Sequence, residues 1–573
     1  MSNQEATKSM ARWVMLTTDA NLPLMAEVLN ISPVMARVMA NRGIRSKKTA
    51  LSFLKASIDN LYPFANMKCA AEAVTRISKA IATNENITVY GDYDADGVTS
   101  TVILYKLLKR LGAIVSYYIP HRITEGYGLN KQAIEKISTG LIIAVDNGIS
   151  AIDEVAFANT LGIDIVIIDH HEPGEILPAA VAIVDPKQHD CPYPFKEMCA
   201  AGLVYKLAEA LCFHLGVPFL EQEESLALAA IGTICDIVPL KDENRILVNC
   251  GLAILNTNKL INPGLGTLLT TRGYLDKQID TFTIGFVLGP CINAAGRLAS
   301  AATAVELLLS ADIALAQELM SLNEERKQLT ANCVDRLLAS LPTEMDKVLV
   351  IVDNETHESL AGIVAGRIRE ATGRPSIVIT RGEGAMKGSG RSAPCYNLFE
   401  ALYANRHLFT RFGGHPMAAG LTMHEENIPL LRETLNSSCT LTEEDFLPIT
   451  EIDCELRLVD ITMQLVNELA RLAPFGSGNK EPLFICRNLF VENIRVLNEK
   501  NTLIFTFGDG SGKVVKGIAF GLNGIYATAI AEANVDNACG YFMDVVCSVE
   551  ANAYNGTVSA QMRVKDFVIY TYG

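Results

Sequence analysis

The stretch ITVYGDYDADGVTSTVILYKLLKRLG, residues 87–112, decides the fold class. Its first four residues are β-branched or aromatic and predict a buried strand, and residues 99–112 have apolar positions at helical spacing. Between them lies a short loop with two glycines and three aspartates. A strand that leads through such a loop into a helix begins a strand–helix–strand unit. The stretch therefore predicts a parallel sheet with helices packed against it.

The same alternation continues as far as Asp185. Strand-like runs follow at residues 141–146, 164–169 and 182–185, and a helix-like stretch occupies residues 151–162. We therefore expect an α/β domain over residues 61–300, with a doubly wound parallel sheet and right-handed crossovers.

The rest of the chain divides into four further segments. We expect an N-terminal helical segment at 1–60, a long connecting helix at 301–342, a smaller α/β domain at 343–445 and a C-terminal β-barrel of the OB type at 446–573. The last assignment depends on the short β-like runs after residue 450, which are typical of a small barrel.

The composition excludes some classes of protein. With 573 residues, 49% of them hydrophobic, the chain can form several cores. A formal charge of -15 argues against a uniformly basic surface, although residues 361–415 hold eight basic residues and only the acids Glu370, Glu383 and Glu400. A signal peptide, a membrane-spanning run and CxxC pairs are not found, so we expect a cytoplasmic protein that binds no membrane.

Acidic and imidazole groups follow the predicted strands and one later apolar helix. They are Asp92, Asp94, Asp96, Asp146, Asp169, His170, His171 and Asp236. Carboxyl ends of parallel strands meet at one edge of a sheet, where several carboxylates would repel one another unless cations neutralised them. Carboxylate oxygens with an imidazole suit Mg²⁺ or Mn²⁺, and two such ions could activate a water and stabilise the leaving oxygen of a phosphodiester. Asp146 is the natural candidate to bridge them.

Simpler explanations exist for each motif taken alone. An aspartate after a strand often caps a turn, and DxDxDG occurs in calcium loops. An EF-hand, however, has a glutamate six residues after the glycine, where this chain has Ile103, and a helix before the loop. For Asp92 a loop hydrogen bond stays open as an alternative, and for Asp169 a strand-end cap or a role in orienting an imidazole.

Four of these motifs together resemble the DHH phosphoesterase family. They are GDYDADGVTST (91–101), VDNG (145–148), DHH (169–171) and CD (235–236). FGGHPMAAG (412–420) resembles the signature of the associated DHHA1 domain. Further segments are similar to those of the bacterial members that degrade single-stranded DNA in the 5′→3′ direction: PHRITEGYGLN (120–130), INAAGRL (292–298), GSGRS (388–392) and PFGSGNKEPLF (474–484). The resemblance covers nearly the whole chain.

The resemblance implies a fold and a metal centre. The fold is a DHH domain, a connecting helix, a DHHA1 domain and an OB-like barrel. It assigns catalytic and metal-binding roles by position. Asp92 and Asp94 belong to one divalent cation, Asp96, His170 and Asp236 to the other, and Asp146 bridges them, while His171 contacts the scissile phosphate.

The resemblance also implies substrate contacts. Ser389 and Arg391, with Arg122 and Tyr127 of the EGYG stretch, belong to a pocket for the 5′-terminal phosphate. Nearer the metals, a phosphate is bound by Asn293 and Arg297, and His415 faces the cleft. Four aromatics of the barrel are candidates for base stacking, although by pattern alone they are more typical of a core: Phe484, Phe505, Phe507 and Tyr526.

The implied function is a single-strand-specific 5′→3′ DNA exonuclease with two Mn²⁺ or Mg²⁺ ions. We expect a monomer that acts in DNA repair, mismatch repair and recombination together with a helicase and a single-strand-binding protein. The alternatives are a DHH phosphodiesterase for short oligonucleotides or cyclic dinucleotides, and a replication scaffold without catalysis. Three sites depart from the family pattern without removing a proposed ligand: Cys291, Ser359-Leu360 and Asp185-Pro186.

Overall fold

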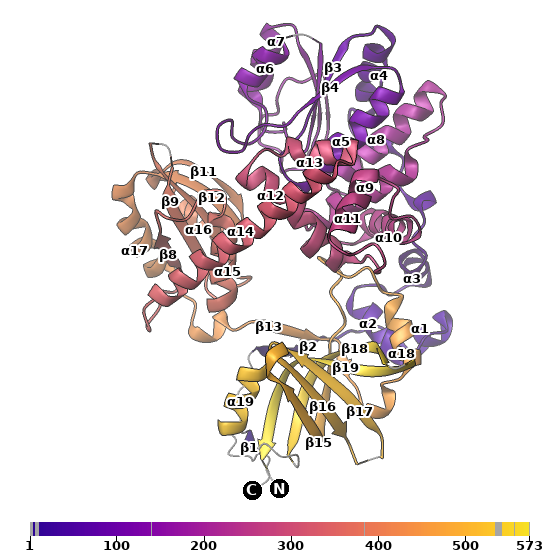
Figure 1. Ribbon diagram of the computed structural model, residues 1–573, viewed down its shortest axis with the longest axis vertical. Helices are drawn as coiled ribbons and strands as arrows, with labels where there is room; N and C mark the ends of the chain where they lie inside the picture. Colours follow the sequence, from indigo (N-terminus) through magenta and orange to yellow (C-terminus); the bar gives the residue numbers. More distant parts are fainter. Residues whose placement is uncertain are drawn as a thin grey trace. The chain divides into compact units, whose positions relative to one another are not determined.

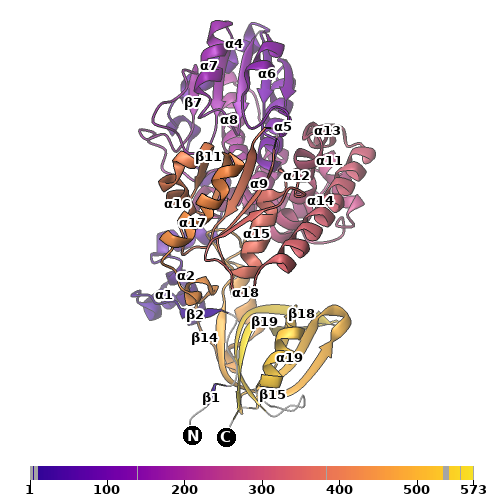
Figure 2. The ribbon, with the colours of Figure 1, turned by 90° about the vertical axis from the view of Figure 1, so that its left-hand side faces the viewer.

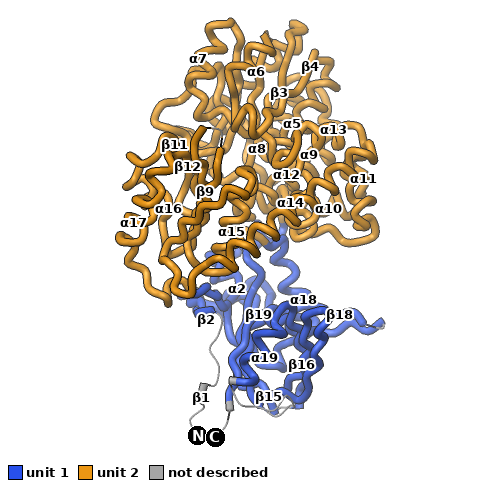
Figure 3. Tube along the Cα trace, turned by 60° about the vertical axis from the view of Figure 1, so that its left-hand side comes forward, with its two compact units in different colours: residues 1–55, 447–475, 479–573 blue, residues 56–446, 476–478 orange. Residues whose placement is uncertain are grey.

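The computed structural model describes residues 4–5, 11–138, 140–382, 384–510, 512–532, 541–554 and 556–571. Glu383, one of the acids counted above, lies outside these residues. The chain forms two units (Figure 3): unit 1 comprises residues 1–55, 447–475 and 479–573, and unit 2 comprises residues 56–446 and 476–478. The division of the chain into five segments stays a prediction.

Unit 2 contains the predicted parallel sheet. Its strands are β3 (Asn86–Tyr90), β4 (Ile114–Tyr118), β5 (Leu141–Val145), β6 (Asp164–Ile168) and β7 (Ala182–Val184). They pair in parallel in the order β4-β3-β5-β6-β7. The chain therefore reverses direction of winding after β4, which confirms the doubly wound α/β class.

Helices cover both faces of this sheet (Figure 1). The helices of this region are α4 (Ala70–Ala82), α5 (Ala95–Arg110), α6 (Lys131–Ile137), α7 (Ile152–Thr160), α8 (Ala200–Leu215), α9 (Gln222–Cys235) and α10 (Asp242–Thr257). Leu141 and Ile143 of β5 share a core with α4, α5 and α8, whereas Ile142 and Ala144 share one with α6 and α7. Burial on both faces explains why the strand sequences are continuously apolar.

A helical segment connects this sheet to a second one. It comprises α11 (Pro263–Thr271), the π-helical turn η3 (Thr283–Leu288), α12 (Gly289–Leu298), α13 (Ala302–Ser310) and α14 (Ile313–Ser340). The predicted connecting helix is present, but it begins at Ile313 instead of at residue 301. Ala311 has a left-handed φ of 62° and ends α13, and Asp312 then caps α14 through its side chain.

The second sheet of unit 2 is mixed. Its strands are β8 (Leu349–Val352), β9 (Ser376–Arg381), β10 (Met386–Arg391), β11 (Phe409–His415) and β12 (Ala418–Met423), in the order β11-β12-β10-β9-β8. Only β8 and β9 are parallel among these described strands. The helices are α15 (Ala361–Thr372), α16 (Leu398–Ala404) and α17 (Ile428–Ser438), with α16 and α17 packing on one face and α14 and α15 on the other (Figure 2).

Unit 1 contains a closed β-barrel. Its strands are β14 (Cys454–Glu455), β15 (Phe484–Leu497), β16 (Thr502–Gly508), β17 (Val514–Phe520), β18 (Phe542–Tyr554) and β19 (Thr557–Thr571), with β1 (Gln4–Glu5) at the edge of β19. The barrel closes because β18 pairs with both β15 and β19. The closed ring consists of the five strands β15, β16, β17, β19 and β18, while β14 and β1 extend it at the edges, and this confirms the OB-like prediction.

The remaining elements are short. In unit 1 they are α1 (Leu22–Leu29), α2 (Pro33–Asn41), α3 (Lys47–Leu54), α18 (Met463–Ala470), α19 (Asn523–Glu532), the parallel pair β2 (Arg12–Met15) and β13 (Ile449–Ile452), and the 3-10 turns η7 (Leu458–Asp460) and η8 (Asn498–Lys500). In unit 2 they are the 3-10 turns η1 (Ile58–Asn60), η2 (Phe64–Asn66), η4 (Arg406–Leu408), η5 (Glu425–Asn427) and η6 (Glu443–Phe446). Residues of α2 and α3 share one apolar core with the barrel.

The four barrel aromatics point inward. Phe484, Phe505 and Phe507 are fully buried, and Tyr526 is 3% exposed. All four belong to the core of unit 1. The interpretation as base-stacking residues is therefore wrong, because the three phenylalanines are strand residues that fill the barrel interior and Tyr526 of α19 packs into the same core. The alternative, a core role, is confirmed.

None of the described helices is by itself long and apolar enough to cross a membrane, and α1 and α2 meet that criterion only jointly, with a bend of 110° between them.

Candidate active site

A tight loop after β3 places the first carboxylates. Asp94 caps α5: its carboxylate accepts hydrogen bonds from the backbone N–H groups of Asp96 at 2.9 Å and Gly97 at 3.1 Å. A side chain at Gly97 would lie 2.5 Å from the carbonyl oxygen of Asp92, so only glycine permits this approach. The loop thereby holds three aspartates within five residues at the end of the strand.

Asp96 is fixed by the beginning of α8. Its Oδ2 accepts from the backbone N–H of Ala200 at 2.7 Å, and its Oδ1 accepts from Ala201 at 2.9 Å. The side chain is almost completely buried. Burial and the nearby charge of Asp94 raise the pKa of Asp96 to about 6. The N-terminus of α8 thus orients the carboxylate of Asp96, which is almost inaccessible to solvent.

His170 lies among carboxylates from three other elements. Its Nε2 is 3.1 Å from Oδ1 of Asp146, 3.8 Å from Oδ2 of Asp96 and 3.7 Å from Oδ2 of Asp236. Asp146 directly follows β5 with a φ of 64°, and Asp236 ends α9. Burial and the charge of His171 lower the pKa of His170 to about 3. The imidazole is therefore neutral at physiological pH, the form that binds a metal.

The potential ligand atoms form three groups, in each of which all atoms lie within 4.8 Å of one another. The groups are Asp92, Asp94 and Asp146; Asp96, His170 and Asp236; and Asp146, His170 and His171. Asp146 and His170 each belong to two of them. We call the six residues Asp92, Asp94, Asp96, Asp146, His170 and Asp236 the carboxylate centre.

The carboxylate centre fits hard divalent cations. Within the described part of the chain, Oδ1 of Asp92 is buried without a hydrogen-bond partner. Burial, followed by the charges of neighbouring carboxylates, raises the pKa values of Asp92, Asp146 and Asp236. A cation would supply both the missing partner and the missing charge, and a set of oxygens with one imidazole suits Mn²⁺ or Mg²⁺.

Asp169 orients His171 beside this centre. Its Oδ1 lies 2.7 Å from Nδ1 of His171 and accepts from the backbone N–H of His170 at 2.7 Å, while its Oδ2 accepts from Ile149 at 2.9 Å. Burial alone would lower the pKa of His171, but the hydrogen bond and charge of Asp169 raise it to about 9. The hydroxyl of Tyr127 donates to the carbonyl of Asp146 at 3.1 Å and lies 3.2 Å from Nδ1 of His171. Asp169 therefore combines the two roles left open for it.

Three guanidinium groups approach one another next to the carboxylate centre. Burial and the charges of Arg122, Arg326 and Arg391 lower the pKa of Arg297 to about 10 despite the charge of Asp94, and burial and Arg122 lower the pKa of Arg391. Among the described residues no carboxylate forms a salt bridge with any of Arg122, Arg297 and Arg391. We call these three the guanidinium cluster. Uncompensated cations held together in this way favour an anion.

Each member of the cluster is held by a different element. Arg122 lies over the ring of Tyr93, with 4.8 Å between its Cζ and the ring centre. Arg297 of α12 donates to the carbonyl of Ser359 at 3.0 Å. Arg391 at the end of β10 donates to the carbonyl of Gly390 at 2.8 Å and lies 3.4 Å from the hydroxyl of Ser389.

Asn293 and His415 complete the predicted set. Oδ1 of Asn293 accepts from the backbone N–H of Ala95 at 2.7 Å, next to the first carboxylates. Both His415 and Arg391 are opposite Ala418 in the sheet, one on each side. Burial and the charges of Arg391 and Lys187 lower the pKa of His415. The structure thus brings the predicted metal-binding and phosphate-binding residues to one region of unit 2, whereas the four barrel aromatics lie in unit 1.

Most other cations of residues 361–415 are neutralised. Ion pairs join Arg367 to Glu370, Arg374 to Glu443, Arg381 to Glu425 and Lys387 to Glu358, with N–O distances of 3.1, 2.6, 3.7 and 2.8 Å. This stretch therefore has fewer unpaired cations than its count of basic residues suggests.

Sequence reasoning also missed Lys187, whose charge affects the pKa values of His170, Asp236 and His415. A lysine two residues beyond a strand-end aspartate was the available signal.

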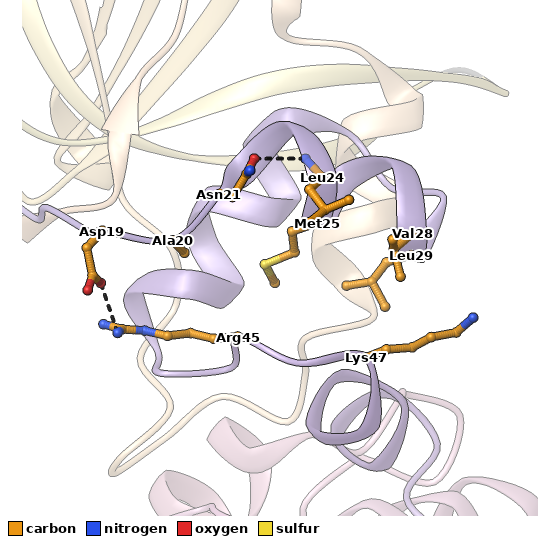
Figure 4. Close-up of a pocket in the computed structure, with 9 residues that line it drawn as sticks. All are labelled: Asp19, Ala20, Asn21, Leu24, Met25, Val28, Leu29, Arg45 and Lys47. Carbon is orange, nitrogen blue, oxygen red and sulfur yellow. Dashed lines mark hydrogen bonds and ion pairs between the residues drawn. The ribbon is translucent and has the colours of Figure 1, made fainter.

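A separate pocket of about 350 Å³ lies in unit 1 between α1 and the segment before α3 (Figure 4). Leu24, Met25 and Leu29 line it with apolar side chains. Its carboxylate, Asp19, is paired with Arg45 at 2.8 Å. This pocket lacks the converging acids that distinguish the carboxylate centre.

Comparison with known proteins identifies three family models along the chain. Residues 86–233 match the model "DHH family, N-terminal domain", residues 345–440 match "DHHA1 domain", and residues 452–566 match "RecJ OB domain". These matches agree with the fold of the first sheet, the second sheet and the barrel.

Individual proteins match over most of the chain. The single-stranded-DNA-specific exonuclease RecJ of Bacillus subtilis (strain 168) is 38% identical, covering 98% of this chain and 71% of the relative. The protein of the same name from Escherichia coli (strain K12) is 32% identical, covering 86% and 90%. The crystal structure of RecJ in complex with Mn²⁺ from Thermus thermophilus is 31% identical, with a TM-score of 0.82, and covers 97% of this chain and 79% of that one.

Proposed function

This chain belongs to the RecJ family of single-stranded-DNA-specific exonucleases, and we propose that it hydrolyses single-stranded DNA stepwise from the 5′ end. The observation that carries the proposal is the proximity of the carboxylate centre to the guanidinium cluster. The first is a site for cations and the second a site for anions. A DNA end with its phosphates meets both requirements.

The metal ligands are proposed from the three groups of the carboxylate centre. Asp92, Asp94 and Asp146 hold one Mn²⁺ or Mg²⁺, and Asp96, His170 and Asp236 hold the other, with Asp146 shared. When bound, such ions act as Lewis acids that lower the pKa of water and neutralise the charge of a leaving oxygen.

The protein's own residues position the phosphodiester. His171, which Asp169 holds at 2.7 Å, offers a charged imidazole to an oxygen of the scissile phosphate. The hydroxyl of Tyr127, which donates a hydrogen bond to the carbonyl of Asp146, lies against the same imidazole and restricts its movement. Asn293 and Arg297 of α12 bind the neighbouring phosphate, where Arg297 can use those N–H groups that do not bond to Ser359.

The guanidinium cluster determines polarity in this proposal. Arg122 and Arg391, with the hydroxyl of Ser389 and His415, bind the 5′-terminal phosphate, which carries more negative charge than an internal phosphodiester. Binding of the 5′-terminal phosphate in this pocket would place the phosphodiester bond next to it at the carboxylate centre. Mononucleotides are then released from the 5′ end.

Replacing Arg391 by alanine tests this assignment. Loss of charge-assisted hydrogen bonds should lower kcat/KM on a 5′-phosphorylated strand about 10- to 100-fold. The same strand with a 5′-hydroxyl should be affected much less, because it lacks the dianion. Steady-state digestion of both strands measures the ratio. Arg381→Ala, which removes an exposed arginine of the same sheet, is the matched control. Equal losses on both substrates would contradict a 5′-phosphate pocket.

The outer face of the barrel is proposed as the platform for the rest of the strand. Arg495, Ile504, Ile518 and Arg563 are cross-strand neighbours in one row, and Lys516 and Phe520 of β17 lie on the same face as Ile518. Phe520 is 53% exposed, and Cζ of Arg563 is 5.7 Å from its ring centre. Basic groups around an exposed aromatic form a sequence-tolerant surface for single strands.

The barrel surface can be tested by salt dependence. Replacing Arg495, Lys516 and Arg563 together by alanine removes three phosphate contacts, so the slope of log K against log salt should fall by about 2. Fluorescence anisotropy with a long oligonucleotide measures it. Lys480→Ala, which removes an exposed cation paired with Glu451 in the same unit, should leave the slope unchanged. A triple variant with the parental slope would exclude this face.

A digestion series separates the proposal from its alternative, a phosphodiesterase for short oligonucleotides or cyclic dinucleotides. Long single strands labelled at the 5′ or 3′ end, a duplex and a dinucleotide are compared with each metal ion. Release of the 5′ label first as a mononucleotide, from the long single strand only, supports the exonuclease. Mononucleotide release from the 3′ end alone would overturn the polarity.

The cellular setting is part of the same proposal. We infer a cytoplasmic monomer that acts in DNA repair and recombination on strands supplied by a helicase and a single-strand-binding protein. The support is the family relationship to the RecJ exonucleases.

A further inference from the structure

Two exposed phenylalanines stack on each other at the π-helical turn η3. Phe282 is 60% exposed and Phe286 is 66% exposed. Their ring centres are 4.9 Å apart and their planes differ by 24°. We call them the phenylalanine pair. Single exposed apolar residues are common on proteins, but two stacked rings that both face solvent form a preorganised flat surface.

The phenylalanine pair is attached to the carboxylate centre by close packing. A Cβ at Gly285 would lie 3.6 Å from Cγ2 of Ile234, and one at Gly289 would lie 2.4 Å from Sγ of Cys235. The first contact joins η3 to the last turn of α9, and the second joins the first residue of α12 to it; Cys235 directly precedes Asp236. Glycine at 289 is therefore required for the junction of η3 and α12 to lie against the helix end that supplies a metal ligand.

The same turn leads into the phosphate-binding helix. η3 ends at Leu288 and α12, which carries Asn293 and Arg297, begins at Gly289. A π-helical turn costs hydrogen-bond geometry and occurs often at functional sites. The wider π-helical turn changes which side chains face solvent, and in η3 the rings of Phe282 and Phe286 are both exposed.

Ile237 adds a third apolar side chain at this end of α9. It directly follows Asp236, is 72% exposed and has a φ of 61°. A β-branched residue in the left-handed region is strained, and such strain is tolerated mainly where function requires the conformation. The strained residue directly follows a proposed metal ligand, and the phenylalanine pair lies shortly before Gly289, which packs against Cys235, the residue preceding that ligand.

We propose that the phenylalanine pair binds unpaired nucleobases of the substrate strand next to the bond that is cleaved. This inference rests on the proposed function. Bases have flat apolar faces that stack on aromatic side chains independently of sequence. In a duplex those faces are covered by neighbouring base pairs, so the pair favours single strands over duplex DNA.

The size of the surface favours bases over a protein partner. A stable protein interface buries roughly 800 Å² on each side, far more than two phenyl rings and one isoleucine offer. One or two bases, in contrast, match the dimensions of two rings. The turn that carries the phenylalanine pair leads directly into α12 and packs against the end of α9, so we expect the pair to bind the same DNA strand as the carboxylate centre.

The test compares the double variant Phe282→Ala/Phe286→Ala with the parent on two oligonucleotides. One is a 5′-phosphorylated strand with all its bases, and the other has abasic residues near the 5′ end. Binding is measured by fluorescence anisotropy in a background of Asp146→Asn, which prevents cleavage. The parent should bind the complete strand about tenfold more tightly than the abasic one, and the variant should bind both alike.

Controls keep this test independent of folding and of catalysis. Phe213→Ala removes a ring that is 89% exposed near the end of α8 and should leave the preference for bases intact. Circular dichroism of the double variant should match the parent. If the double variant keeps the tenfold preference, stacking on this pair is excluded. Absence of hydrolysis by the protein with Asp146 intact, together with base-dependent binding, would contradict the exonuclease proposal but would support the phenylalanine pair.

Discussion

Replacing Asp146 by asparagine is expected to lower hydrolysis of single-stranded DNA by ~10³-fold or more without unfolding the protein. Asp146 belongs to two of the three ligand groups, and its Oδ1 lies 3.1 Å from Nε2 of His170. An amide keeps the shape of the side chain but loses the charge that would be shared between two cations. Asparagine also tolerates the φ of 64° at this position, whereas alanine would add backbone strain.

Two measurements check this expectation. Single-turnover digestion in Mn²⁺ measures how far the rate of cleavage falls. Thermal unfolding with and without Mn²⁺ measures how much metal binding raises the melting temperature. Removing one of several mutually repelling carboxylates should raise the melting temperature of the metal-free protein and reduce the gain on adding Mn²⁺. Asp153→Asn, the same chemical change at an exposed residue of α7, is the control. Turnover at the parental rate would show that Asp146 is not a shared ligand.

The carboxylate centre was largely predictable because topology determines it. Parallel strands end at one edge, so Asp94, Asp146 and His170 had to lie near one another once the strands were identified. Asp236 is different, since it ends a helix instead of a strand, so parallel-strand topology alone did not require it to lie at this edge. The structure adds the distances, with Nε2 of His170 within 3.8 Å of carboxylates of Asp96, Asp146 and Asp236.

The sequence pattern favoured a core role for the barrel aromatics, but it could not establish their orientation or the ion pairs of the basic stretch, for a physical reason. Whether Phe505 faces inward depends on strand register, and a shift of one residue reverses every side chain. Likewise, whether Arg374 is free depends on Glu443, a residue 69 positions away. Exposure of Phe282 depends on a π-helical turn that no local pattern announces. Each of these properties arises from long-range packing.

A buried ion pair in unit 2 is a further feature that sequence alone does not reveal, and it carries a large expected effect on stability. Nζ of Lys206 lies 2.7 Å from Oε1 of Glu243, with side chains 1% and 0% exposed. Glu243 also accepts from the backbone N–H of Tyr62 at 2.8 Å and from the hydroxyl of Tyr193 at 2.6 Å. The pair joins α10 to α8, whose N-terminal N–H groups bind the carboxylate of Asp96.

Replacing Lys206 by methionine should therefore destabilise unit 2 by about 3–5 kcal/mol, because it leaves a buried carboxylate without its cation. The double variant Lys206→Met/Glu243→Gln should recover part of that loss, since the second change removes the unpaired charge. Lys327→Met breaks an exposed pair with Glu324 and should cost less than about 1 kcal/mol.

Hydrogen exchange of α8 and α10 during urea unfolding measures the effect where it is expected. The chain has a single tryptophan, Trp13, which lies in unit 1, so its fluorescence reports on unit 1 and serves as an internal reference. Lys206→Met should accelerate exchange in α8 and α10 far more than Lys327→Met does. Because α8 also supplies the N–H groups that orient Asp96, the same variant should weaken Mn²⁺ binding before unit 2 unfolds. If Lys206→Met and Lys327→Met were equally stable, the buried pair would contribute no more than a surface pair.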